Sequence, residues 1–102
     1  MKPETIIQTA ARCFGCTPEG IRSKNHKDRL HSDARRAVYV ILRKHAQPRW
    51  KYREIAREFK RASAGSIHAM SHRGIGYAET DPEYAARYHK LLSMLNGKEP
   101  AQ

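Results

Sequence analysis

Apolar residues recur along this chain at the spacing of amphipathic helices. The first group occupies one face of a predicted helix and consists of Ile6, Ile7, Ala10, Ala11 and Phe14. Gly15 follows directly and is well suited to end that helix. Thr17-Pro18-Glu19 has the order of an N-cap, a first helical position and an acidic first turn, so a second, short helix is predicted through Ile21.

The clearest pattern lies in the middle of the chain. Residues 33–45 carry an apolar stripe with arginine and lysine at other positions, which predicts the central helix. The stripe consists of Ala34, Ala37, Val38, Ile41 and Leu42. Between this helix and the one before it, residues 23–29 contain no apolar side chain and predict a basic loop.

The next two segments predict a helix-turn-helix. Residues 50–59 place four apolar side chains on an inward face, namely Tyr52, Ile55, Ala56 and Phe59. After a brief break at Lys60-Arg61-Ala62, Ser63 can cap a further helix that buries Ile67 and Met70. Two short helices joined by a short turn, in the basic part of the chain, are typical of this motif.

A weak point and a last helix complete the pattern. Gly74-Ile75-Gly76 is expected to interrupt the helix, because two glycines in three residues disfavour continuous helix. The last helix is predicted from Thr80-Asp81-Pro82-Glu83 to a stop at Asn96-Gly97. Its apolar stripe could form a dimer seam, but we favour the intramolecular core, since a small domain cannot spare four large side chains; these are Tyr84, Tyr88, Leu91 and Leu95.

No strand alternation and no internal repeat are visible in the sequence. The predicted fold is therefore a small all-α domain of five to six helices over residues 1–97, followed by a short polar tail at residues 98–102. We expect a monomer or a weak dimer.

Positive charge is concentrated in 40 residues of the chain. Lys and Arg number 20 against 10 Asp and Glu, which gives a formal net charge of +10. Fourteen basic and four acidic residues lie between Arg22 and Arg61, whereas the remainder is balanced. A surface that binds a polyanion requires such clustering, because each neutralised phosphate releases condensed counterions. A surface that only solubilises the protein does not require it.

The segment Cys13-Phe14-Gly15-Cys16, followed by His26 and His31, has the form C-x2-C-x9-H-x4-H. Zinc fingers usually have about twelve residues between the second cysteine and the first histidine, and apolar residues among them pack a small core. In this chain nine residues, most of them polar, separate Cys16 from His26. A thioredoxin-type dithiol needs a preceding strand. A helix end followed by a helix cap explains the segment without a ligand, so no metal or other cofactor is expected, and zinc stays as the alternative.

Catalytic and membrane functions find little support. No convergent nucleophile or metal triad is present, and Glu54 and Glu58 have basic neighbours typical of surface ion pairs, so no enzyme activity is expected. No run of 18 or more apolar residues predicts a membrane span, and the first residues lack a signal-peptide core. We therefore expect a cytoplasmic protein with no membrane partner.

Several segments, taken in order, resemble one family. They are Ile7 to Phe14, Gly15 to Lys24, the basic loop, Ala34-Arg35-Arg36-Ala37, Arg53 to Phe59 and Ile67-His68-Ala69. Over roughly residues 5–94 the chain is similar to the C-terminal DNA-binding domain of the bacterial replication initiator DnaA. The resemblance implies a Trp-repressor-like helix-turn-helix that binds double-stranded DNA on the bacterial nucleoid. No P-loop is present, so it implies a free-standing domain, as in phage or mobile-element proteins.

The resemblance also implies which residues contact DNA. The helix-turn-helix would enter the major groove and the basic loop the adjacent minor groove, along which would lie Lys24, His26, Lys27 and Arg29. Arg35 matches a phosphate-contacting arginine at the start of the central helix, and Arg43 matches a basic position at its end. Tyr52 and Arg53 replace a Leu-Pro pair that approaches the DNA, and His68 matches a histidine near the backbone.

Some of these side chains have a structural alternative. Tyr52 could cover the core, as an aromatic residue entering a helix often does. His68 could be a polar spacer, and Arg35 a solvated surface residue. Lys51, from the same basic segment, is a further expected contact.

The recognition helix departs from the family pattern. Where the family has Asp-His-Thr-Thr, this chain has Ala62-Ser63-Ala64-Gly65, and Ala and Gly cannot read base edges by hydrogen bonding. Small residues after Ser63 would let the helix N-terminus approach phosphate, with Ala64 near a thymine methyl. Specificity would then shift to DNA shape or to other side chains, namely Arg53, Arg61 and Ser66.

Double-stranded DNA binding, in replication initiation control or transcription regulation, is the leading hypothesis. RNA binding by a basic helical protein is an alternative, although few aromatic platforms are available for stacking. A zinc-dependent or protein-binding adaptor is the third possibility.

Overall fold

The computed structural model describes residues 2–23, 28–61 and 63–97. Six helices make up most of this part of the chain: α1 (Pro3–Phe14), α2 (Pro18–Arg22), α3 (Arg29–Lys44), α4 (Tyr52–Glu58), α5 (Ala64–Thr80) and α6 (Pro82–Leu95). The described residues contain no strand, which confirms the all-α prediction.

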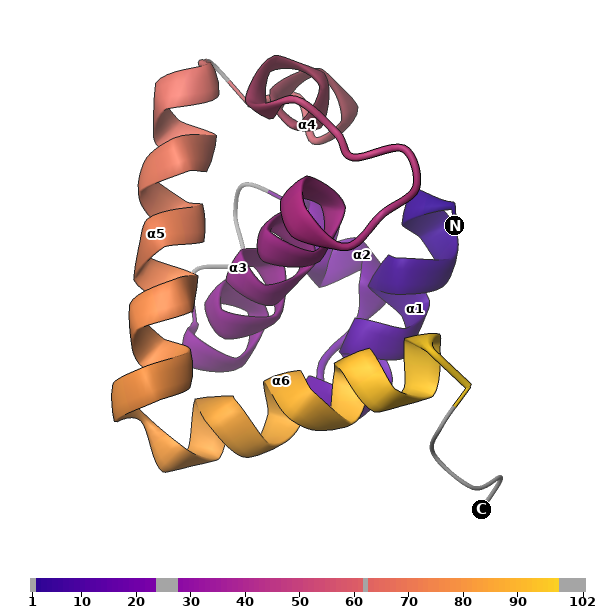
Figure 1. Ribbon diagram of the computed structural model, residues 1–102, viewed down its shortest axis with the longest axis vertical. Coiled ribbons are helices and arrows are strands. Elements are labelled where there is room, and N and C mark those ends of the chain that lie inside the picture. The colour runs from indigo at the N-terminus through magenta and orange to yellow at the C-terminus, as the bar shows by residue number, and fades with distance from the viewer. Residues whose placement is uncertain (1, 24–27, 62, 98–102) are drawn as a thin grey trace.

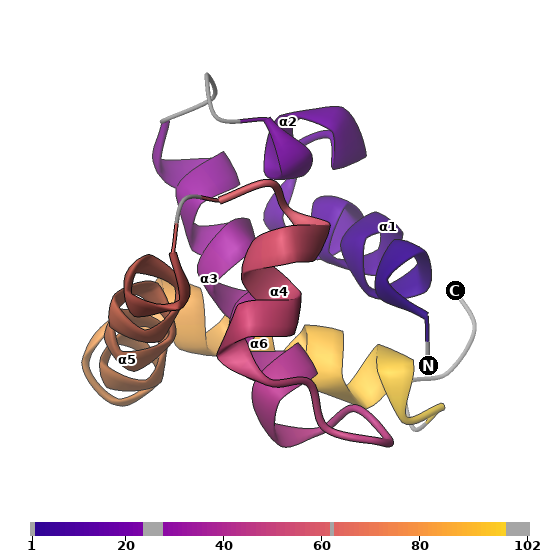
Figure 2. The same ribbon diagram turned by 90° about the horizontal axis from the view of Figure 1, so that it is seen from above.

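Helix α3 lies at the centre and contacts each of the other five helices (Figure 1). Helices α5 and α6 form an L along two sides of it, α1 and α2 lie on the opposite side, and α4 covers the side of α3 that faces the viewer in Figure 2. In Figure 1 α4 is seen nearly end-on and α5 from the side, whereas in Figure 2 α4 is seen from the side and α5 end-on. The axes of these two helices, which form the helix-turn-helix, therefore cross steeply.

The central position of α3 follows from its sequence. All five residues of the predicted stripe are fully buried, and so are Tyr39 and, almost completely, Val40. A helix that is apolar on several faces needs partners on several sides. The other helices therefore assemble around α3, and each covers part of it.

The junction between α1 and α2 confirms the predicted helix end and cap. Gly15 has a φ of 70°, in the left-handed region, and the next amide, that of Cys16, donates to the Ala11 carbonyl at 3.0 Å. The Thr17 hydroxyl then accepts from the Gly20 amide at 3.0 Å and caps α2. Residues 13–17 thus reverse the chain by local hydrogen bonding.

Helix α3 begins earlier than its apolar stripe predicts. The Asp28 carboxylate accepts from the His31 amide at 3.2 Å, which caps the helix and brings Arg29 into its first turn. The expectation that Arg29 belongs to the basic loop is therefore wrong. The remainder of that predicted loop, residues 24–27, lies outside the described residues.

The turn between α4 and α5 is built without glycine. Lys60 takes the left-handed conformation, with a φ of 54°. The Arg61 amide donates to the Ala56 carbonyl at 2.8 Å, and the Lys60 amide donates to the Arg57 carbonyl at 3.2 Å, so the end of α4 closes on itself. Ser63 caps α5 by accepting from the Ser66 amide at 3.2 Å, as predicted. Ala62, within the turn, lies outside the described residues.

The predicted interruption at residues 74–76 is wrong, because α5 runs continuously from Ala64 to Thr80. The two glycines differ in their surroundings. A Cβ at Gly74 would lie 2.9 Å from the Tyr84 hydroxyl and 3.1 Å from Val40 Cγ2, whereas a Cβ at Gly76 would meet nothing within 4 Å. Gly74 therefore marks a close crossing of α5 over α3. Its lack of a side chain lets the two helices pack closely and does not interrupt α5.

The apolar stripe of α6 joins the intramolecular core, as expected. Tyr84 and Leu91 are fully buried and Tyr88 nearly so, while Leu95 packs against the same core from a half-buried position. Tyr84 lies among aromatic rings from three helices, and its ring centroid is 5.9 Å from that of Phe14 and 6.0 Å from that of Tyr77.

Substitution of the two glycines by alanine should have opposite effects. Gly74→Ala should lower the free energy of unfolding by about 1–3 kcal/mol, because the new methyl group overpacks the α3–α5 crossing. Gly76→Ala should raise it by about 0.5–1 kcal/mol, since alanine favours helix and nothing opposes its side chain. Urea unfolding followed by circular dichroism measures both, and equal effects of the two substitutions would contradict the role given to Gly74.

Candidate nucleic-acid interface

The N-terminal half of α5 presents one face to solvent. Ile67, Ser71 and Gly74 are buried against the rest of the protein. The opposite positions are exposed and form what we call the α5 face: Gly65, Ser66, His68, Ala69, His72 and Arg73. Over these positions the helix carries no acidic residue, and three of the six side chains are glycine, alanine or serine. A duplex could therefore approach the backbone of α5 closely.

The start of α5 matches part of the predicted contact set. Ser63 and Ser66 are exposed and Ala64 is half-buried. The two serines are already engaged with each other, because the Ser66 hydroxyl donates to the Ser63 carbonyl at 3.0 Å. Their hydroxyl groups therefore stabilise the helix start in the free protein.

A line of ring contacts joins α3, α4 and α5. The Arg43 guanidinium lies over the Tyr52 ring, 4.8 Å from its centroid. The Tyr52 and His68 rings meet edge-on with centroids 5.0 Å apart, and the His68 and His72 centroids are 4.1 Å apart. Tyr52 is half-buried, so it packs between the helices and also reaches the surface. The predicted residues Arg43, Tyr52 and His68 are thus brought together.

Helix α4 carries cations on its outer face. Arg53 and Arg57 are exposed and lie one helical turn apart, so they line the same side of the helix. Lys51, just before the helix, and Lys60, just after it, are exposed as well. The Glu54 carboxylate caps the start of α4, since it accepts a hydrogen bond from the Lys51 amide at 2.8 Å.

A basic hollow of about 460 Å³ lies at the junction of α3 and α4. It is lined by Arg43, Lys44, His45, Arg49 and Tyr52. Burial lowers the pKa of His45, and the positive charges of Lys44 and Arg49 lower it further. A hollow with three permanent cations and no carboxylate in its lining suits an anionic group such as phosphate.

The cations of this region are free of acidic partners within the described part of the chain. Over residues 28–61 and 63–97, no ion pair with a carboxylate forms at the following positions: Arg43, Lys44, Arg49, Lys51, Arg53, Arg57, Lys60 and Arg73. Their charge is therefore available to an external anion.

Arg35 does not lie on the surface, which corrects its expected phosphate contact. Its residue is only 4% exposed, and its guanidinium donates to the Ile21, Gly20 and Ser23 carbonyls at 2.8, 2.8 and 3.0 Å. Burial lowers the pKa of this guanidinium, and the nearby Arg61 adds to the effect. Arg35 satisfies the carbonyls at the end of α2 and fixes α2 against α3.

Two further arginines of the basic segment are committed to internal contacts. Arg61 is half-buried and donates through Nε to the Tyr39 hydroxyl at 3.2 Å. Arg22 pairs with Glu4 at 2.9 Å and with Glu58 at 3.1 Å, and so ties α2 to α1 and α4. Arg61 therefore offers less to a base edge than the sequence predicts.

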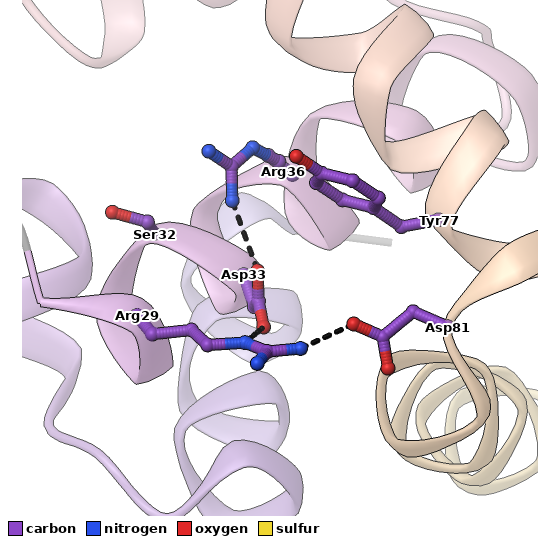
Figure 3. A pocket seen from close by; sticks show the side chains of 6 residues that line it. All are labelled: Arg29, Ser32, Asp33, Arg36, Tyr77 and Asp81. Atoms are coloured by element: carbon purple, nitrogen blue, oxygen red, sulfur yellow. Dashed lines mark hydrogen bonds and ion pairs between the residues drawn. The ribbon is translucent and has the colours of Figure 1, made fainter.

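Arg29 lies between two carboxylates at the corner of α3, α5 and α6 (Figure 3). It pairs with Asp33 at 3.3 Å and with Asp81. Asp33 is buried and also accepts from Arg36 at 2.9 Å, while the Arg36 guanidinium covers the Tyr77 ring. The Arg29 side chain is 63% exposed, so it can reach an external anion, but in the free protein its charge is compensated.

Three predicted contacts, Lys24, His26 and Lys27, lie outside the described residues. The minor-groove role of the basic loop therefore stays a prediction.

The two cysteines point to different neighbours. The Cys13 thiol is 3.5 Å from the Met94 sulfur, and the Cys16 thiol is 3.9 Å from the Leu30 carbonyl. Burial raises the pKa of Cys16 to about 11, and the Asp28 charge contributes. Within residues 2–23, 28–61 and 63–97, no cluster of three or more metal-ligating side chains forms. His26, the first histidine of the zinc alternative, lies outside these ranges.

His31 has a structural environment. Its ring lies where a Cβ on Gly20 would be, 2.1 Å from Nε2. The Asp28 carboxylate is 2.8 Å from His31 Nδ1, and the Thr17 amide donates to His31 Nε2 at 3.3 Å. The hydrogen bond from the ring lowers the pKa of Asp28. The ring thus links Thr17, the N-cap residue of α2, to Asp28, the N-cap residue of α3.

Several residues of the candidate interface were not among the predicted contacts, among them Lys44, Arg49, Arg57, Lys60, Ala69, His72 and Arg73. Ala69, His72 and Arg73 continue the α5 face, and their signal in the sequence is the helical spacing from His68 and Ser66. Arg49 reaches the basic hollow from an irregular segment, for which no periodic signal exists.

No protein-family model matches this chain, and no curated protein matches it. Within the described residues, none of the helices combines the length and the apolar character needed to cross a bilayer.

Replacement of Arg35 tests its structural role. Arg35→Met should lower the free energy of unfolding by about 3 kcal/mol, because it leaves buried carbonyls at the end of α2 without donors. Arg53→Met, at an exposed position, should change it by less than about 0.5 kcal/mol. Chemical denaturation measures both, and an unchanged stability of Arg35→Met would restore Arg35 as a candidate phosphate contact.

Proposed function

We propose that this protein binds double-stranded DNA, with the α5 face in the major groove and the cations of α4 and of the basic hollow on the flanking phosphates. The observation that carries the proposal is an exposed helix face with small side chains that is joined, through the contacts of His68 with Tyr52 and of Tyr52 with Arg43, to cations without an acidic partner in the described part of the chain. The resemblance to the DNA-binding domain of the replication initiator supports the same assignment.

The shape of the α5 face favours a duplex groove. The major groove of B-DNA is about 12 Å wide and admits one helix. Gly65 and Ala69 present almost no side chain, so the helix can seat deeply in the groove. His68, His72 and Arg73 can then donate hydrogen bonds to base edges or to phosphates from the same face.

The net charge of residues 43–73 favours a polyanion as the ligand. From residue 43 to residue 73 there are nine Lys and Arg against two Glu. One of these carboxylates, Glu58, is engaged by Arg22. Each phosphate neutralised on a duplex lowers the slope of log K against log salt by about 0.9, so binding should weaken steeply as salt is added.

Single-stranded RNA is less well served. Binding of unpaired bases relies on exposed aromatic rings. Among the described residues, Tyr77 is the one large apolar side chain that is exposed, at 37%, and the Arg36 guanidinium covers its ring. Through duplex binding, the protein would act in replication initiation control or in transcription regulation.

A pair of charge-matched substitutions tests the proposal. Ala69→Glu places a carboxylate on the α5 face, and Ala86→Glu places the same charge on an exposed position of α6. Ala69→Glu should weaken binding to duplex DNA at least about tenfold through repulsion of phosphate, and Ala86→Glu should have a much smaller effect. Fluorescence anisotropy with a labelled random-sequence duplex at several salt concentrations provides the measurement.

Three results would overturn the proposal. They are no binding to duplex DNA, tighter binding to an RNA hairpin than to duplex DNA, and equal losses for Ala69→Glu and Ala86→Glu. Selection from a random duplex library then reports whether the α5 face distinguishes sequences.

The compensated charge of Arg29 gives a further prediction for the same assay. Asp81→Asn removes one of its carboxylate partners while the amide can still cap α6. It should tighten duplex binding by about two- to fivefold and steepen the salt slope by about 0.9, provided Arg29 reaches a phosphate. The control is Glu79→Gln, which makes the same change of charge at an exposed position of α5. Equal effects of both variants would exclude Arg29 from the interface and leave the role of α5 intact.

A further inference from the structure

Two histidines of the α5 face, which the DNA-binding proposal uses as hydrogen-bond donors, also form a pair with a chemistry of its own. His68 and His72 are both exposed and are four residues apart on one helix. Residues at this spacing lie one above the other on a helix surface. Their ring centroids are 4.1 Å apart and the ring planes are inclined by 42°. The two imidazoles are therefore already gathered at one point of the surface.

This arrangement suits the chemistry of a metal ion. Imidazole nitrogen binds divalent copper, nickel and zinc, with metal–nitrogen distances of about 2.0–2.1 Å for zinc. One ring nitrogen of each histidine can reach a common ion by rotation about the side-chain bonds, without any movement of the helix. Once one histidine has bound the ion, the nitrogen of the other histidine binds it intramolecularly, which raises the affinity above that of a single histidine.

The surroundings orient the pair and leave it accessible. Tyr52 packs edge-on against His68, with centroids 5.0 Å apart, and limits its ring orientation. Tyr52 is itself held beneath the Arg43 guanidinium. On the other side, the neighbouring positions of α5 are small, namely Gly65 and Ala69, so an ion and its water ligands have room.

We propose that His68 and His72 together bind one divalent transition-metal ion on the α5 face. Among the described residues no third metal-ligating side chain joins the pair, so water fills the remaining coordination positions. The affinity should follow the usual order for imidazole sites, with Cu²⁺ above Ni²⁺ and Zn²⁺. The inference rests on the free chain and is independent of DNA binding.

A change of spacing provides a matched test. The double substitution Ala69→His with His72→Ala keeps two histidines on the exposed face but places them at adjacent positions, which point in different directions around the helix. All three positions are exposed, so the fold should persist, and circular dichroism checks this. Isothermal titration with Ni²⁺ in a non-chelating buffer measures the affinity of the full chain, its double variant, His72→Gln and a control, His89→Gln.

The proposal expects one Ni²⁺ site in the native chain. His72→Gln and the spacing variant should each weaken it at least about tenfold, whereas His89→Gln should leave it unchanged. Paramagnetic broadening of amide signals by Ni²⁺ should centre on residues 68–72. Native affinity in the spacing variant, or broadening centred on Cys13, Cys16 and His31, would overturn the proposal.

Discussion

The close crossing of α5 over α3 sets the geometry of this protein. At Gly74 a single methyl group would lie only 3.1 Å from Val40 Cγ2 of α3 and 2.9 Å from the Tyr84 hydroxyl of α6. The buried face of α5 is fixed by this contact, and so is the direction of its exposed face. Because α6 leaves α5 at Asp81 and packs Tyr84 into the same place, the corner between the two helices depends on the crossing as well.

The fold divides the basic segment of the sequence into two groups. Arg22, Arg35 and Arg36 bind carbonyls, carboxylates or rings inside the protein and hold the helices together. The cations from Arg43 onward lie mostly on the surface without carboxylate partners in the described residues. A count of charge along the chain cannot separate these groups, because the difference arises from partners on other helices. The proposed interface is therefore narrower than the basic segment and shifted toward α4 and α5.

The sequence correctly predicted those features of the fold that contacts between residues close in the chain determine. Gly15 and Thr17 define the ends of α1 and α2 through hydrogen bonds within a few residues, and the stripe of α3 identified the buried helix. The failures depend on distant partners. The continuity of α5 at Gly74 reflects Val40, which is 34 residues away in the chain, and the burial of Arg35 reflects carbonyls of α2. Of the candidate site, the sequence named Arg43, Tyr52 and His68 one by one, whereas their contacts with one another and the basic hollow depend on the packed structure.

The small residues of the α5 face have a consequence for how such a surface changes. Gly65 and Ala69 contribute nothing to the core, so new side chains at these positions cost the protein little stability. Substitutions at Gly65 and Ala69 can therefore change the surface without changing the stability of the fold. The scaffold can acquire a different preference for its ligand in single steps, each of them tolerated, as long as Gly74 keeps α5 in place.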